Sequence, residues 1–128
     1  MSLLTRDQIL TADDLQTEDV PVPEWGGTVR VTGLTGTERD AFEAEILGDG
    51  KKRNLANLRA KLVARSAVDE NGARVFTDGD IGKLGLKSAS ALTKVFEVCQ
   101  RLSGLTPDDV EELAGNSEAG QSDSSTSA

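Results

Sequence analysis

Valines alternate with prolines or polar residues on either side of a double glycine between residues 17 and 32. A period of two puts side chains on one face of a β-strand. The residues with this spacing are Val20, Val22, Val29 and Val31. With Gly26-Gly27 as a two-residue turn, the pattern predicts a hairpin at about 17–32 in which Val22 faces Val31 and the valines share one side.

Two prolines mark the first strand of this expected hairpin. Pro21 and Pro23 fall in the opposite phase to the valines, and proline has no N–H to donate to a neighbouring strand. We therefore expect the first strand to lie at the edge of its sheet. An open edge beside Trp25 is either a blunted edge or a docking site for another chain.

Apolar residues spaced three and four apart predict helices along most of the remaining chain. The expected helices cover about 36–47, 52–66, 88–103 and 107–114. Thr35 with Glu38 has the spacing of a capping box, and Thr5 with Gln8 repeats it, so a short additional helix is expected near the N-terminus.

The apolar faces of these helices predict a single core. We expect it to contain Phe42, Leu58, Leu62, Leu92 and Phe96. Asn71-Gly72 indicates a second small hairpin with a type I′ turn. The expected fold class is thus mainly α with a small N-terminal β-hairpin (α+β), as a compact helical domain of residues 1–115. The serine-rich stretch 116–128 has no large apolar residue, which predicts a disordered tail.

The composition limits the classes of function that fit the chain. Of its 128 residues 37% are hydrophobic and 3% aromatic, which favours one domain with a modest core. A net charge of −8 argues against nucleic acid as a partner, because phosphates are held by clustered lysine and arginine. The sequence also predicts no membrane span and no signal peptide, which favours the cytoplasm.

Residues suited to catalysis or metal binding are scarce. The sequence has no histidine and no tyrosine and a single cysteine, Cys99. Histidine supplies most hydrolase triads and zinc sites, and Cys99 has no histidine to activate it. The segment 69–80 lacks the closing glutamate of a calcium loop. We therefore expect no catalytic, cofactor-binding or metal site, and no enzyme activity.

Trp25 has two interpretations at this level. It could plug a local core over the helix that follows Thr35, or it could anchor the chain in a pocket of a partner. The two are compatible if the partner is a second copy of the chain. The protein-interface residues that we expect are Val20, Val22, Trp25, Val29, Val31 and Phe76.

An ordered set of short segments between Ile9 and Leu113 carries a family resemblance. The segments are VPVPEWGG at 20–27, VRV at 29–31, LT at 34–35, ERDAFE at 38–43, NLRAKLVA at 57–64, VDENG at 68–72, FTD at 76–78 and LSGL at 102–105. In this order they resemble the tail assembly chaperones of long-tailed bacteriophages (siphoviruses), particularly of phages that infect Gram-positive hosts. None of the segments is a catalytic signature.

The resemblance implies a non-catalytic chaperone that acts in the host cell cytoplasm during virion morphogenesis. Members bind the aggregation-prone tape measure protein, keep it soluble and help to recruit the major tail protein. They self-associate and are absent from the mature virion. Many are made in two lengths by a ribosomal frameshift. This chain is similar to the shorter product, which implies a homo-oligomer that co-assembles with a longer form.

Two other classes of binding protein stay open. One is a structural tail component, such as a connector or terminator, that is retained in the virion. Its presence in purified particles would favour this class. The other is a small regulatory binding module from a bacterial genome, which the neighbouring genes would distinguish from a phage protein.

Overall fold

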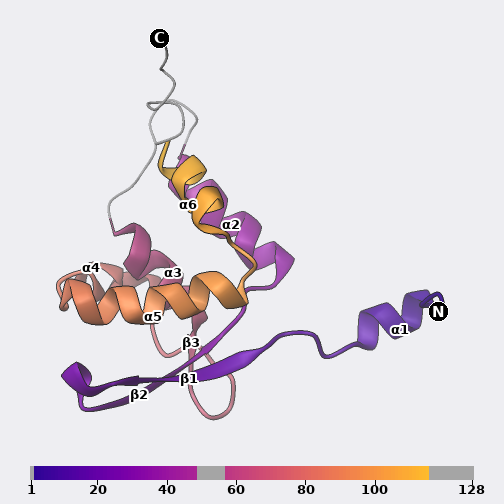
Figure 1. Ribbon diagram of the computed structural model, residues 1–128, viewed down its shortest axis with the longest axis horizontal. Coiled ribbons are helices and arrows are strands. Elements are labelled where there is room, and N and C mark those ends of the chain that lie inside the picture. The colour runs from indigo at the N-terminus through magenta and orange to yellow at the C-terminus, as the bar shows by residue number, and fades with distance from the viewer. Residues whose placement is uncertain (1, 49–56, 116–128) are drawn as a thin grey trace, which may run out of the picture.

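The computed structural model describes residues 2–48 and 57–115 of the chain (Figure 1). It has a three-stranded antiparallel sheet in the order β1-β2-β3, and helices make up most of the remainder. The strands are β1 (Thr17–Val22), β2 (Gly27–Thr32) and β3 (Ala67–Val68). The helices are α1 (Arg6–Thr11), α2 (Gly36–Leu47), α3 (Leu58–Ser66), α4 (Ile81–Leu84), α5 (Ala89–Leu102) and α6 (Pro107–Ala114). The predicted α+β fold class is confirmed.

The hairpin forms at the expected place, but its predicted register is wrong. Val20 pairs with Val29, and Val22 pairs with Gly27 rather than with Val31. The loop is longer than two residues because Pro23–Trp25 form a turn of 3₁₀ helix, closed by Gly26 at a φ of 80°. Proline favours the start of such a turn, and glycine the left-handed position that ends it. The valines still share a face, because the register moved by an even number of residues.

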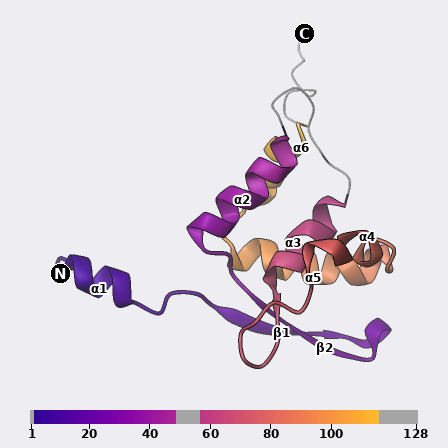
Figure 2. The same cartoon turned by 180° about the vertical axis from the view of Figure 1, so that it is seen from behind.

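The sheet is covered on its valine face by two helices. α3 and α5 lie side by side, and α5 packs across both β1 and β2 (Figure 1). β1 is the edge strand, as its prolines predict. Seen from behind, α2 and α6 form a separate pair that rises from the α3–α5 layer (Figure 2). α1 projects from the end of β1 that is farther from the hairpin tip.

The predicted core is confirmed. Phe42, Leu62, Leu92 and Phe96 belong to one cluster of buried residues, and Leu58 packs against it partly buried. The small sheet and the two central helices therefore share one core, which the α2–α6 pair extends.

Threonine caps begin three of the helices, two of them at the expected residues Thr5 and Thr35. Capping boxes join Thr5 to Gln8, Thr35 to Glu38 and Thr106 to Asp109. Thr77 caps the 3₁₀ turn Asp78–Asp80 that precedes α4 in the same way. A threonine hydroxyl can accept from the backbone N–H three residues on, and the side-chain oxygen of that residue accepts from the backbone N–H of the threonine.

The turn at residues 69–72 differs from the type I′ turn that Asn71-Gly72 predicts. Gly72 has a φ of 84°, but Asn71 does not adopt a positive φ, and a type I′ turn requires both. Asp69 accounts for the difference, because its carboxylate accepts bonds from the N–H groups of Asn71 and Ala73 at 2.8 and 3.0 Å. This side chain stabilises the alternative turn.

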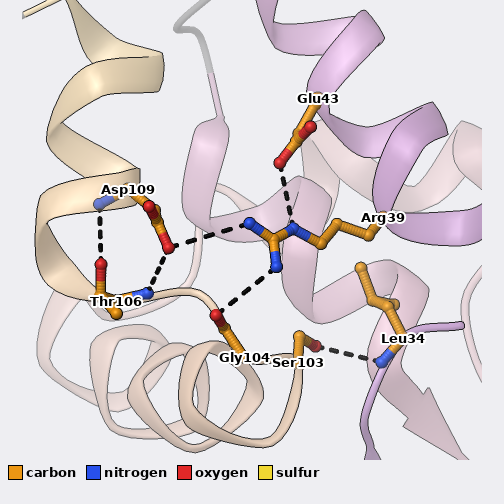
Figure 3. Close-up of polar contacts among 7 residues, drawn as sticks. All are labelled: Leu34, Arg39, Glu43, Ser103, Gly104, Thr106 and Asp109. Atoms are coloured by element: carbon orange, nitrogen blue, oxygen red, sulfur yellow. Dashed lines mark hydrogen bonds and ion pairs between the residues drawn. The ribbon is translucent and has the colours of Figure 1, made fainter. Parts of the chain in front are cut away.

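Arg39 on α2 joins this helix to α6 and, through a bond of 3.5 Å from its Nη1 to the Gly104 carbonyl, to the loop after α5 (Figure 3). Its Nε donates to Glu43 at 3.0 Å, and its Nη2 lies 3.8 Å from Asp109 on α6. Nearby, the backbone N–H of Leu34 donates to Ser103 Oγ at 3.1 Å. These contacts join the start of α2 to the end of α5 and the start of α6.

Two expectations fall wholly or partly outside the described residues. The helix expected at 52–66 is seen as Leu58–Ser66, with Asn57 at its N-cap, and residues 52–56 lie outside the described ranges. The tail expected at 116–128 lies wholly outside them. Among the described residues no helix has the length and apolar character needed to cross a bilayer.

Candidate protein-binding site

An apolar pocket of about 400 Å³ lies beside the hairpin tip. Three segments that are distant in sequence form it: the 3₁₀ turn of the hairpin, the loop that precedes α4, and α4 with the turn that follows. The lining residues are Trp25, Val75, Phe76, Asp80, Lys83, Leu84 and Lys87. Figures 1 and 2 both place the hairpin tip and α4 at the same end of the molecule.

Trp25 forms one wall of the pocket. The 3₁₀ turn holds it in place through a bond from Gly26 N–H to the Pro23 carbonyl at 3.0 Å. Glu24 fastens the same turn to α5 by an ion pair of 3.3 Å with Lys94. A hydrogen bond from its own backbone N–H, followed by the contact with Lys94, lowers the pKa of Glu24. The turn is therefore attached to the helix layer and presents the indole from a fixed position.

The indole N–H of Trp25 is buried and has no acceptor among the described residues. The ring itself packs, partly buried, against the core. A buried N–H without an acceptor costs about 1–3 kcal/mol. Trp25 thus combines the local packing of a core residue with a wall of a surface pocket. The expected core plug over the helix that follows Thr35 is wrong in its location, because Trp25 lies beside Phe76 and α4 instead.

Val75 and Phe76 form the opposite wall. Two hydrogen bonds hold the backbone of this segment against the end of α3 and β3. Val75 N–H donates to the Ala67 carbonyl at 3.0 Å, and Arg74 Nε donates to the Ala64 carbonyl at 3.1 Å. Phe76 is half-buried and packs on the core, whereas Val75 is 52% exposed. The wall therefore offers apolar surface to solvent.

The rim of the pocket is charged. Asp80 is engaged in the cap of its own turn, where it accepts from Thr77 N–H at 2.9 Å. That backbone bond, with a second from the Thr77 hydroxyl, lowers the pKa of Asp80. Lys83 and Lys87 form no ion pair within the described part of the chain. The rim accordingly presents two ammonium groups around an apolar floor.

The six residues expected at an interface separate into two groups. Trp25 and Phe76 come together in the pocket. Val20, Val22 and Val31 lie in the core of the chain itself, with exposures of 4%, 0% and 0%, and offer no surface to a partner in this structure. Val29 is half-buried and packs against that core. The valine face is therefore covered by α3 and α5 rather than by another chain.

Several pocket residues were not anticipated from the sequence. They are Val75, Leu84, Lys83 and Lys87. The signal that could have been used is the pair Val75-Phe76, two adjacent apolar residues just after a predicted turn. Successive side chains of a strand point to opposite faces, so the two cannot both face the core. The lysines gave no such signal, because isolated lysines are common on any surface.

Reactive groups contribute little to this site. Cys99 is fully buried in the core, and burial raises the pKa of its thiol to about 12. A thiol in this position stays protonated at neutral pH and behaves as a small apolar side chain. Within residues 2–48 and 57–115, no three acidic, cysteine or histidine side chains gather in a way that could hold a metal ion.

Comparison with known proteins adds no relative to this description. A scan against family models, a search of curated proteins and a search of solved structures find no significant match to the chain.

Proposed function

We propose that the chain is a non-catalytic tail assembly chaperone of a long-tailed bacteriophage that holds the tape measure protein through the pocket at the hairpin tip. The observation that carries the proposal is the pocket itself, which joins Trp25 and Phe76 in one apolar recess. Both residues lie in segments of the family resemblance, FTD at 76–78 and VPVPEWGG at 20–27. The fold supports a binding role, and the resemblance supplies the partner.

The pocket suits an apolar side chain that projects from another protein. Its volume of about 400 Å³ lies within the range of about 300–1,000 Å³ that is typical of binding pockets. An aromatic wall and half-exposed aliphatic residues are the surface that binds an amphipathic helix, and the tape measure protein is expected to be largely helical. Lys83 and Lys87 would attract acidic residues beside the apolar anchor.

The charge of the whole chain supports the solubilising part of the role. The net charge is −8, although the pocket rim is basic. A complex that buries the pocket keeps the remaining acidic surface toward solvent, and like charge between complexes opposes aggregation. The chain would also help to recruit the major tail protein, self-associate and co-assemble with the longer frameshifted form. It would act in the host cytoplasm and be absent from the mature virion.

Co-expression with the tape measure protein encoded beside it tests the proposal. The wild-type chain is expected to raise the soluble fraction of that protein. The variant Val75→Ser/Leu86→Ser removes exposed apolar surface from the pocket wall and from the turn after α4, and it is expected to lose most of this gain. Leu47→Ser is the matched control, because Leu47 is also an exposed aliphatic residue but lies at the end of α2, away from the pocket.

Two outcomes would contradict the proposal. No gain in solubility with the wild-type chain would remove the chaperone role. An equal loss with Leu47→Ser would remove the pocket from it. Detection of the chain in purified particles would favour a structural tail component instead.

A further inference from the structure

The N-terminal arm, residues 2–16, carries most of the exposed apolar surface of the described chain. Eight large apolar side chains are exposed among the described residues, and five of them belong to the arm. They are Leu3, Leu4, Ile9, Leu10 and Leu15, with exposures between 44% and 93%. α1 buries none of its residues, and Figures 1 and 2 show it projecting from the body.

The sequence nevertheless encodes a complete helix start in the arm. Thr5 N–H donates to Gln8 Oε1 at 2.9 Å, and Gln8 N–H returns a bond of 3.2 Å to the Thr5 hydroxyl. Isolated helices shorter than about 12–15 residues are marginal in water, and α1 has 6 residues. A capped helix of this length therefore needs a surface on which its apolar side chains can pack.

The pocket at the hairpin tip is the complementary surface. Of the three remaining exposed apolar residues, Val75 lies in its wall, and Leu86 is not a lining residue but stands in the turn between the lining residues Leu84 and Lys87. The charges are complementary as well. The rim carries Lys83 and Lys87, whereas the arm carries Asp7, Asp13 and Asp14 against the single cation Arg6. Asp13 and Asp14 form no ion pair within the described residues.

The arm and the pocket lie at opposite ends of the hairpin. The arm leaves β1 at Thr17, and the pocket begins after Val22, so the length of the strand, roughly 20 Å at about 3.3 Å per residue, separates them. In both views the arm points away from the tip. It would have to reverse at residues 12–16 and run back along β1 to reach the pocket of its own chain.

We propose that the N-terminal arm of one copy docks in the tip pocket of a second copy. Ile9 and Leu10 enter the apolar recess, and Asp13 and Asp14 approach Lys83 and Lys87. The contact joins two different surfaces. When two copies have joined, one still has a free arm and the other a free pocket, so the assembly grows into a ring or an open chain. This inference rests on the self-association in the proposed function and names the surfaces that produce it. Because the arm and the tape measure protein use the same pocket, a given pocket holds an arm only while no client occupies it.

Complementary variants test the contact, with the full chain and no client. The arm variant Ile9→Ser/Leu10→Ser keeps an intact pocket, and the tip variant Lys83→Glu/Lys87→Glu keeps an intact arm. All four positions lie outside the core, so both variants are expected to fold, which circular dichroism would check. Analytical ultracentrifugation then gives the mass of wild type, of each variant, and of an equimolar mixture of the two.

We expect the wild type to form multimers whose size depends on concentration. The association constant of each variant should be lower by on the order of tenfold or more, because central interface residues have been replaced. The mixture should form 1:1 dimers and nothing larger, because it contains one functional arm and one functional pocket. Leu47→Ser should associate like the wild type.

Each other result separates this contact from the rest of the account. A wild type that stays monomeric at all concentrations contradicts self-association and the contact together. Multimers that persist in both variants leave self-association standing and overturn the contact. A mixture that stays monomeric also overturns it, because an intact arm on one copy and an intact pocket on another would then have failed to bind each other.

Discussion

Single residues at the tip combine local packing with an exposed recess, and Trp25 is the clearest example. Its ring packs on the core while its indole N–H is buried without an acceptor. Ring and N–H can be separated by substitution. Trp25→Phe removes the unsatisfied donor and keeps an aromatic ring, and Trp25→Ala removes both.

We predict opposite effects of these two substitutions on the free energy of unfolding. Trp25→Phe should leave it unchanged or raise it by up to about 1 kcal/mol, since an unsatisfied donor is lost. Trp25→Ala should lower it by about 2 kcal/mol, less than for a fully buried aromatic residue. Urea unfolding followed by circular dichroism measures both. A loss for Trp25→Phe that comes close to the loss for Trp25→Ala would show that the N–H has a partner.

Asp109 should make the stability of the chain sensitive to acid. The backbone N–H of Thr106 donates to its carboxylate at 2.9 Å. That bond, with smaller contributions from the Thr106 hydroxyl and Arg39, lowers the pKa of Asp109 below its ordinary 3.8. A group whose pKa is lowered by folding stabilises the fold above its ordinary pKa, and this contribution is lost as the pH falls through the lowered value.

The variant Asp109→Asn is predicted to weaken this pH dependence. The amide keeps an oxygen for the Thr106 N–H but binds no proton, so the free energy of unfolding should fall less between about pH 5 and pH 2 than in the wild type. Asp108→Asn is the matched control, because Asp108 lies in the same first turn of α6 without a capping bond. Identical acid dependence in all three proteins would contradict the assignment.

At the scale of elements, pattern predicted the faces of the strands better than their register. The valine period determined which face of the hairpin is buried, and that face is the one against α5. Register depends on the loop, and Gly26-Gly27 suggested a two-residue turn. Pro23 changes this, because it starts a 3₁₀ turn that includes Trp25. The loop then has four residues, Pro23 to Gly26, between the paired ends Val22 and Gly27.

The junction between the sheet and α5 depends on a glycine for space rather than for its dihedral angles. A Cβ at Gly33 would lie 2.5 Å from the carbonyl oxygen of Leu102, and Gly33 has no positive φ. Around it, Gly33 N–H donates to the Gln16 carbonyl at 3.0 Å. The backbone of the strand end therefore lies directly against the C-terminal end of α5.

Gly33→Ala is predicted to destabilise the chain by about 2 kcal/mol, since neither backbone can move away without breaking these contacts. Gly27→Ala provides the control, because Gly27 lies at the other end of β2 from Gly33 and a Cβ there meets nothing within 4 Å. Thermal unfolding of the two variants gives the comparison. Equal midpoints would contradict the close approach of β2 and α5.

At the scale of the whole molecule, the core followed from the sequence and the pocket did not. Periodicity identifies the buried faces of helices, so Phe42, Leu62, Leu92 and Phe96 were predictable. A surface pocket arises where segments distant in sequence meet, here near residues 25, 76 and 84. Trp25 and Phe76 could be chosen separately as aromatic residues outside the helices, but nothing in their spacing shows that they are neighbours.

For the N-terminal arm, the helix could be predicted from the sequence but its position relative to the domain could not. Its capping box predicted a helix, and α1 forms there. Whether that helix packs on its own domain depends on the direction in which the linker at residues 12–16 leaves β1, and local sequence does not specify this direction. Only the arrangement in space shows that five exposed apolar side chains project from the body.

Amide hydrogen exchange of the co-purified complex tests most directly whether the tip pocket receives a segment of the tape measure protein. Compared with the free chain at a concentration at which it is monomeric, we predict slower exchange in peptides that cover Trp25, Val75-Phe76 and residues 81–87, with unchanged exchange in α2 and α6. Protection centred on α2 and α6, or no protection at the tip, would contradict the account.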